Sequence, residues 1–311
     1  MDIKYPSFQD VDFWEEELQH YVECDAHSCG DNGNVWGYFK YCLQTQNRYF
    51  FQNPLVPIIL ERFRANTFVL EANTQLYRAR IDHKRKIEEQ NWLAKRLKNL
   101  QATELTAEEE ANKELATSIR SFQARGIKTI LENPEYQEFC KRKSLGFEGF
   151  DAKDSGAPPY DVVGAGRCNP DHVAFLYAAN DRHTAVAEVR PFIRDAISVA
   201  TMQVKSDLRL IDLYFEYDEN GAIRIEDVFW HKIRSEFSLL NKGNKDDYLI
   251  TQYITLLAQN AGYDGIRFRS SSVFEGTNYV IFDSTKCVPV SSKMYIIPRV
   301  QYTLAPIIND D

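Results

Sequence analysis

An arginine, a tyrosine and a glutamate are the residues of this sequence whose types and spacing point to chemistry. Arg167 lies in a turn rich in glycine and proline, Tyr177 follows ten residues later, and Glu188 follows eleven residues after that. The intervening run VAFLYAA is typical of a buried strand. Charged side chains are costly to bury unless they are paired. Arg167 and Glu188 therefore either form a structural salt bridge or flank a cleft that binds a ligand.

Predicted strands and one clear helix must position this segment. Strand-like runs occur at 197–204 and 208–215, and again in the motifs GIRFRS and NYVIF. A helical pattern begins at Asp246 and ends at Gly262, since glycine is favoured directly after a helix. The helices do not alternate strictly with the strands. The sequence therefore predicts an α+β fold with a mixed or mostly antiparallel sheet.

The pattern of apolar residues in 1–70 predicts a small helical N-terminal module. Apolar side chains recur at helical spacing from Trp14, and Pro57 opens a short apolar helix with the sequence IILERF. The simplest interpretation of these apolar stripes is that they form core. Cys24, His27 and Cys29 lie close together and could bind zinc, with Cys42 as a fourth ligand, but their spacing favours a polar loop.

Residues 83–145 are the most charged part of the chain and predict a helical insertion. Thr106 and Glu109 have the spacing of a capping box, which opens a helix with Leu115, Ile119 and Phe122 on one face. Six lysines and arginines precede it, and an acidic run follows. A basic helix that binds a membrane or a partner is the alternative, but the mixed charge favours a solvated helical hairpin.

Composition excludes several classes of partner. The chain has 311 residues, of which 44% are hydrophobic and 26% charged, as in soluble globular proteins. Its net charge of −8 argues against a surface that binds nucleic acid or an anionic membrane. A ligand that carries phosphate therefore needs its own positive pocket. The acidic start argues against a signal peptide, and the lack of a long apolar run argues against a spanning helix. The six scattered cysteines predict free thiols, and together these features predict a cytoplasmic protein.

Six separated motifs together resemble the RES domain family. They are LYR at 76–78, GRCNP around Arg167, LYAAND around Tyr177, TAVAEVR around Glu188, YDGIRFRSS around Ser270, and NYVIF from Asn278. The resemblance implies a domain over residues 71–295 with an ADP-ribosyltransferase-like fold, followed by a tail at 296–311. It also implies a toxin of a toxin–antitoxin pair that destroys NAD by phosphorolysis or hydrolysis. The long interval from Arg78 to Arg167 and the cysteine in GRCNP depart from the family pattern.

The resemblance assigns roles that fit the chemistry of NAD. Glu188 is expected to hold the ribose and to stabilise positive charge at C1′, because nicotinamide leaves as a neutral group and one carboxylate can suffice. Arg78 and Arg167 are expected to bind the diphosphate or free phosphate. Tyr177 is expected to stack on or orient the nicotinamide ribose.

Neutral hydrogen bonds to the ligand are expected from Ser270 and Asn278, with Tyr77 and Ser271 as weaker candidates. The substrate would be NAD, with phosphate as a possible second substrate. No metal or other cofactor is expected.

Each assignment has a structural alternative. Tyr177 could be an ordinary core tyrosine, and Ser270 and Asn278 could make turn hydrogen bonds. An ADP-ribosyltransferase would use the same site with a macromolecular acceptor, and an inactive domain could instead bind a partner through the charged helices. His172 and His183 are left outside the predicted site, because an isolated histidine is more often a surface residue. The acceptor, the antitoxin and the oligomeric state are left open.

Overall fold

The computed structural model describes residues 39, 43–44, 53, 55–83, 86–106, 109–110, 112–215, 228–238 and 248–300. The cysteine and histidine cluster at 24–42 and the chain beyond 300 lie outside the described residues, as do most residues of the proposed N-terminal module. Phe39 and Leu43 are described, and both are helical and buried, as the apolar stripe predicts.

One eight-stranded sheet, in the order β1-β5-β6-β7-β3-β2-β4-β8, forms the centre of the fold. Its strands are β1 (Thr67–Leu70), β2 (Gln75–Ile81), β3 (Leu176–Ala179), β4 (Ala196–Val204), β5 (Leu208–Leu213), β6 (Gly265–Arg269), β7 (Thr277–Ile281) and β8 (Cys287–Ile296). β5 and β6 are parallel, whereas β1 with β5, β6 with β7, β7 with β3, and β3 with β2 are antiparallel. The predicted α+β class with a mixed, mostly antiparallel sheet is confirmed.

The chain divides into two compact units. The first comprises Met1–Tyr77, Gly156–Glu188 and Met202–Val288, and the second comprises Arg78–Ser155, Val189–Thr201 and Pro289–Asp311. All contacts of the candidate site described below lie within the first unit.

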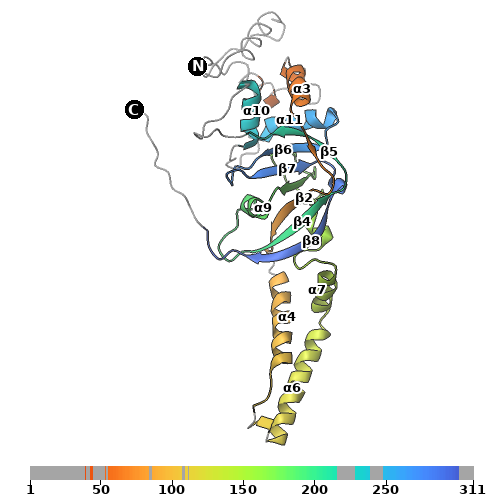
Figure 1. Ribbon diagram of the computed structural model, residues 1–311, viewed down its shortest axis with the longest axis vertical. Helices are drawn as coiled ribbons and strands as arrows, with labels where there is room; N and C mark the ends of the chain where they lie inside the picture. Colours follow the sequence, from red (N-terminus) through yellow and green to blue (C-terminus); the bar gives the residue numbers. More distant parts are fainter. Residues whose placement is uncertain are drawn as a thin grey trace, which may run out of the picture. The chain divides into compact units, whose positions relative to one another are not determined.

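Three helices pack on one face of the sheet in the first unit (Figure 1). They are α3 (Leu55–Ala65), α10 (Val228–Ser238) and α11 (Leu249–Asn260). Phe63, Phe237, Ile254 and Val280 are fully buried between them and the strands. α11 ends before Gly262, whose φ of +78° suits glycine, so the predicted end of this helix is confirmed.

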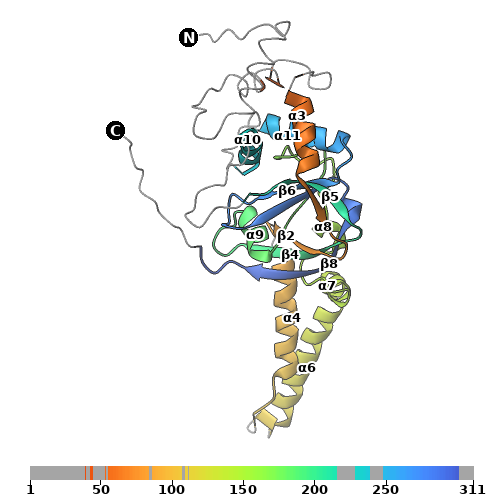
Figure 2. The same cartoon turned by 45° about the horizontal axis from the view of Figure 1, so that its top comes forward.

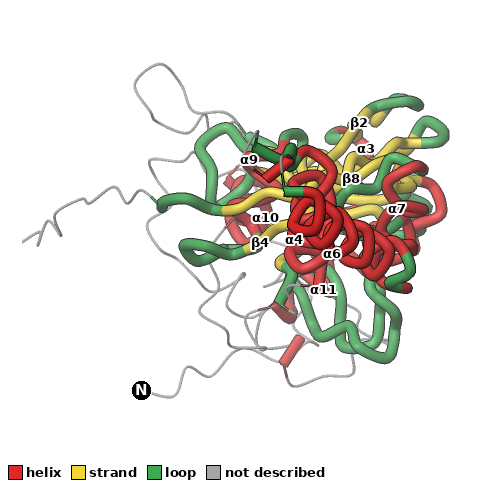
Figure 3. The backbone as a smooth tube through the Cα atoms, turned by 90° about the horizontal axis from the view of Figure 1, so that it is seen from below, coloured by secondary structure: helices red, strands yellow, loops and turns green. Residues whose placement is uncertain are grey.

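The second unit contains the charged helices α4 (Lys86–Ala102), α6 (Lys113–Leu131) and α7 (Pro134–Ser144). α4 and α6 run side by side in every view (Figures 1, 2 and 3). The contact of the predicted capping box forms, because Thr106 N donates to Glu109 Oε2 at 2.8 Å. It does not open α6, however, since the N-cap of that helix is Asn112, whose Oδ1 accepts from Leu115 N at 3.1 Å. The second unit also contains the short helix α8 (Ala152–Ser155), whereas α9 (Arg182–Glu188) and the 3₁₀ turn η3 (Ser284–Lys286) belong to the first unit.

The face of α6 that carries the largest apolar side chains is not the buried one. Leu115 and Phe122 are 45% and 65% exposed, whereas Ala116 and Ile130 are buried. Small residues set the seam, since a Cβ on Gly126 would lie 3.2 Å from Leu100 Cδ1 of α4. Because α4 and α6 approach closely, α6 packs on α4 with the stripe that contains its small residues, and the neighbouring stripe with the largest apolar side chains stays exposed. In the described part of the chain, no helix combines the length and apolarity needed to cross a bilayer.

Candidate active site

A row of four residues in register crosses the sheet at the candidate site. Tyr77 of β2 pairs with Ala179 of β3, Ala179 pairs with Asn278 of β7, and Asn278 pairs with Phe268 of β6. Residues paired in this way point to the same face of a sheet. The small side chain of Ala179 therefore separates Tyr77 from Asn278, and this set is called the site row below.

The carboxylate of Glu188 is anchored by two buried side chains. Ser270 Oγ donates to Glu188 Oε1 at 2.5 Å, and Asn278 Nδ2 donates to the same oxygen at 2.9 Å. Ser270 and Asn278 are 5% and 8% exposed, but Glu188 itself is exposed. Within the described residues, Glu188 Oε2 accepts no hydrogen bond. The arrangement fixes one carboxylate oxygen and leaves the other for a ligand.

The short helix α9 (Arg182–Glu188) holds Glu188 over the sheet. Asp181 caps it, because Thr184 donates through its amide to Oδ1 at 2.9 Å and through its hydroxyl to Oδ2 at 2.6 Å. Burial raises the pKa of Asp181, but the hydrogen bonds from Thr184 and His183 together lower it below its ordinary value. The cap is therefore ionised at neutral pH and fixes the start of the helix.

A glycine lets the loop after β6 approach α9. A Cβ on Gly276 would lie 2.8 Å from Thr184 Oγ1 and 3.0 Å from Ser270 Cβ. Ser270 Oγ also accepts from the amides of Ser272 and Val273 at 3.1 and 3.2 Å. Ser270 thus makes the turn hydrogen bonds of the structural alternative and contacts Glu188 as well. Of the three consecutive serines, it is the one that reaches this carboxylate.

The arginine turn is defined here as residues 166–169, and Tyr177 holds it from the sheet. Tyr177 Oη donates to Asn169 Oδ1 at 2.7 Å and accepts from Cys168 N at 2.9 Å. Burial is the main cause that raises the pKa of Tyr177 well above its ordinary value. Burial likewise raises the pKa of the Cys168 thiol to about 12. Both groups remain protonated at neutral pH, and the tyrosine acts as a fixed neutral donor.

Side chains of helix α11 hold the same turn by donating to the carbonyl groups of the turn. Thr251 Oγ1 donates to Arg167 O at 2.5 Å, and Gln252 Nε2 donates to Gly166 O at 3.0 Å and to Asn169 O at 2.9 Å. A Cβ on Gly166 would lie 2.6 Å from Asn169 Oδ1 and 3.1 Å from Tyr177 Oη. The backbone of the turn is therefore fixed from two elements, and glycine at 166 leaves the space that they need.

The guanidinium of Arg167 contacts the end of a helix and an aromatic ring of the site row. Its Nη1 donates to the carbonyls of Glu236, at 3.1 Å, and Phe237 in the last turn of α10. Its Cζ lies 5.8 Å from the ring centroid of Phe268, which pairs with Asn278. A cation at a helix C-terminus is stabilised by the helix dipole.

Arg167 and Glu188 thus contact two neighbouring residues of one row, Phe268 and Asn278. Within the described residues, Glu188 is held by Ser270 and Asn278 rather than by Arg167. The two charges approach the same row from different elements without forming the simple salt bridge.

The sequence model of the RES domain matches residues 141–304, which is more than half of the chain. The chain belongs to the RES domain family. Arg167, Tyr177, Glu188, Ser270 and Asn278 all fall inside the matched range, so the family predicted from the six motifs is confirmed.

One solved structure similar to this RES domain protein is the crystal structure of the M. tuberculosis MbcT-MbcA toxin-antitoxin complex. The identity is 11%, the match covers 77% of this chain and 92% of that chain, and the TM-score is 0.35. No curated protein matches the sequence.

Arg182 is a candidate residue of this RES domain that the sequence motifs did not reveal. Its Cζ lies 5.0 Å from the ring centroid of Tyr77, and its side chain is exposed at the start of α9. Arg182 and Glu188 therefore stand at the two ends of one helix, next to Tyr77 and Asn278 of the site row. The signal available in the sequence was an arginine just after the capping Asp181, six residues before Glu188.

The roles predicted for Arg78 and Ser271 are not decided by the contacts described above. Arg78 is half-buried and follows Tyr77 in β2, and Ser271 is half-buried in the loop after β6. Their parts in ligand binding stay predictions. Among the described residues, no group of histidine, cysteine and acidic side chains is arranged to hold a metal ion.

Proposed function

We propose that this RES domain protein breaks the bond between nicotinamide and ribose in NAD. The observation that carries the proposal is the exposed carboxylate of Glu188, whose Oε1 is anchored by Ser270 and Asn278 and whose Oε2 is left for a ligand. A fixed carboxylate stabilises the positive charge that develops at C1′, and it does so best where no reorganisation is required. A carboxylate without the two donors Ser270 and Asn278 would not be held in a fixed position.

The bond changes need no general acid. The C1′–N bond breaks with its electron pair going to the ring nitrogen, so the positively charged ring leaves as neutral nicotinamide. An oxygen of phosphate or water then forms the new bond to C1′, and in the case of water one proton is released to solvent. The products are nicotinamide with ADP-ribose 1″-phosphate or with ADP-ribose.

Two arginines of the site are proposed to hold anionic groups of the substrates. Arg182 lies on Tyr77 at the end of the helix opposite Glu188, and within the described residues it forms no ion pair. Guanidinium groups match phosphate oxygens through paired donors. Arg182 is therefore the better placed of the two for the diphosphate, while Arg167 donates part of its hydrogen bonds to α10.

Tyr177 is proposed to act by positioning the arginine turn rather than by contacting NAD. Its hydroxyl is shared between Cys168 N and Asn169 Oδ1, which leaves its ring on the buried side of the turn. This interpretation replaces stacking on the nicotinamide ribose with support of Arg167.

The test is to incubate the purified full-length protein with NAD, with and without phosphate, and to identify the products. Wild type should release nicotinamide, and the second product, ADP-ribose 1″-phosphate or ADP-ribose, identifies phosphate or water as the acceptor. Glu188→Gln should lose the activity, while Glu132→Gln, an exposed glutamate on the helical hairpin, should retain it. ADP-ribosylated protein with equal nicotinamide release would instead indicate a transferase. Equal turnover by wild type and Glu188→Gln would refute the proposal.

A role as a toxin restrained by an antitoxin is part of the same proposal and rests on the family. Expression of wild type should then arrest growth and lower cellular NAD, and expression of Glu188→Gln should do neither. Growth arrest by both proteins would separate toxicity from the proposed reaction and would favour the partner-binding alternative.

A further inference from the structure

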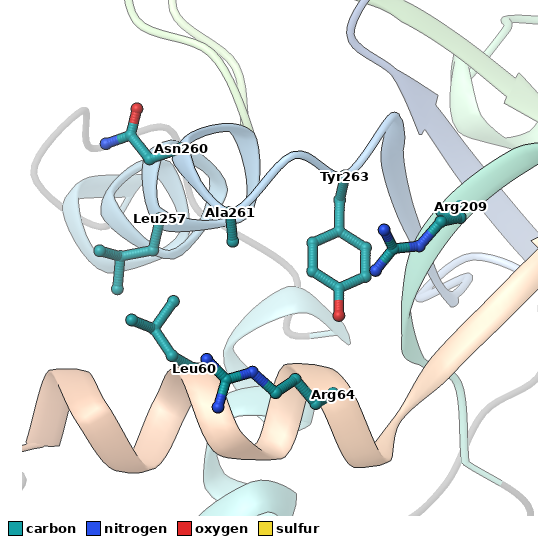
Figure 4. A pocket seen from close by; sticks show the side chains of 7 residues that line it. All are labelled: Leu60, Arg64, Arg209, Leu257, Asn260, Ala261 and Tyr263. Atoms are coloured by element: carbon teal, nitrogen blue, oxygen red, sulfur yellow. The ribbon is translucent and has the colours of Figure 1, made fainter.

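A cavity of about 310 Å³ lies between α3 and α11 in the first unit (Figure 4). Its apolar lining comes from Leu60 of α3, and from Leu257 and Ala261 at the end of α11. None of these residues takes part in the contacts around Glu188 or in the arginine turn. The volume lies at the small end of the range for ligand pockets.

Two guanidinium groups line this cavity from different elements. Arg64 lies in the last turn of α3, and Arg209 lies on β5 with its Cζ 4.9 Å from the ring centroid of Tyr263. Both side chains are exposed, and within the described residues neither forms an ion pair. The cavity therefore carries two positive charges, although the net charge of the chain is −8.

Asp264, which follows the cavity residue Tyr263 in the chain, is occupied by other donors. The carboxylate of Asp264 accepts from Lys286 Nζ at 2.6 Å and from the backbone amide of Arg209 at 2.8 Å. The α3 helix dipole accounts for one arginine in its last turn, but it does not account for Arg209 on a strand.

Tyr263 gives the cavity a rigid wall. It is 6% exposed, and its hydroxyl donates to Phe63 O at 2.9 Å and lies 3.1 Å from Thr67 Oγ1. Because the ring is fixed, the cation–π contact also limits the positions that the Arg209 guanidinium adopts. The wall and one of the cations are therefore preorganised, which lowers the entropy cost of binding.

We propose that this cavity is a second ligand site, which binds a small organic anion. The phosphate or carboxylate of the ligand accepts from the guanidinium groups of Arg209, beside the Tyr263 ring, and of Arg64, whose exposed side chain turns from Leu60 toward it (Figure 4). The apolar part of the ligand packs on Leu60, Leu257 and Ala261. Phosphate and carboxylate both match the guanidinium donors, so the shared chemistry is an oxyanion attached to a compact apolar group.

The experiment is calorimetric titration of the full-length protein with phenyl phosphate, benzoate, inorganic phosphate and phenol. Phenyl phosphate or benzoate should bind, and the tighter of the two names the oxyanion. Inorganic phosphate should bind more weakly because it lacks the apolar part, and phenol should not bind. Arg64→Gln and Arg209→Gln should each weaken binding at least about tenfold, a loss of about 1.4 kcal/mol.

Three control variants make the result decisive. Arg125→Gln replaces another exposed arginine, on α6, and should leave the affinity unchanged. Glu188→Gln and Arg182→Gln should also leave it unchanged. Loss of binding in Glu188→Gln and Arg182→Gln, rather than in Arg64→Gln and Arg209→Gln, would assign the ligand to the proposed NAD site and overturn the inference. Phenol binding as tightly as phenyl phosphate, or no binding of either aromatic anion up to about 10 mM, would overturn it as well.

Discussion

Glu188 and Arg167 stand at the two ends of one sequence segment, and the fold treats them differently. Glu188 is exposed, and buried partners hold one of its oxygens while the other accepts no hydrogen bond within the described residues. Arg167 is half-buried, and its Nη1 donates to the last carbonyls of α10. The difference teaches that a fixed charged group with one atom left unbonded, such as Glu188, indicates ligand binding. A charged group that donates its hydrogen bonds to the protein backbone, such as Arg167, indicates first a structural role in positioning the site.

Among substitutions that leave the Glu188 carboxylate in place, removal of both of its anchors should have the largest effect on activity. Ser270→Ala with Asn278→Ala should lower kcat for NAD cleavage about 100-fold, because the carboxylate then has to be oriented during each turnover. Each single variant should lose about tenfold. Steady-state rates of nicotinamide release measure this. A double variant with the kcat of wild type would show that the anchors are merely structural.

The buried thiol in the arginine turn should make stability depend on alkaline pH. The ordinary pKa of a cysteine is about 8.5, and burial raises that of Cys168 to about 12. The unfolded chain therefore loses the proton first, so stability is fully present below pH about 8.5 and falls above it, by about 1.4 kcal/mol per pH unit for this group.

Urea unfolding at a series of pH values between about 8 and 10.5 tests this dependence. Cys168→Ala should reduce the slope of the free energy of unfolding against pH by the amount that corresponds to about one proton. Cys140→Ala, which removes an exposed thiol, should leave this slope unchanged. Equal slopes for Cys168→Ala and wild type would mean that the arginine turn is not the closed, buried element described above.

Arg182 should give the smallest and most selective effect. Arg182→Gln should raise KM for NAD about fivefold to tenfold with little change in kcat, because it removes binding that is equal in the ground and transition states. Arg194→Gln, a substitution of another arginine outside α9, serves as the control. An unchanged KM would remove Arg182 from the site and would leave the diphosphate to Arg167 or Arg78.

Local features of the fold were predictable from the sequence, but its register was not. Strands β3 to β7 and the end of α11 at Gly262 follow from short-range patterns of apolar residues, glycine and caps. The site row depends on which residue of β2 faces which residue of β3, and a shift of one residue would turn Tyr77 to the other face. Pairing between strands about a hundred residues apart has no local signal.

The candidate site shows the same division. The six motifs predicted Glu188 together with Ser270 and Asn278, which do meet in the structure. They did not predict that Arg167 contacts α10, because that contact joins residues about seventy positions apart and α10 had no clear signal of its own. They also missed Arg182, whose importance depends on the ring of Tyr77 lying beneath it.

The most direct test of the central comparison measures kcat for NAD cleavage and the thermal midpoint in the same preparations of Glu188→Gln and Arg167→Gln. Glu188→Gln should lose at least about 1,000-fold in kcat and keep the wild-type midpoint, because an exposed side chain with one fixed oxygen serves the reaction and not the fold. Arg167→Gln should lower the thermal midpoint, because its lost hydrogen bonds to α10 reduce the free energy of unfolding by about 1 to 2 kcal/mol. A Glu188→Gln variant that unfolds more easily while keeping its kcat would contradict the account.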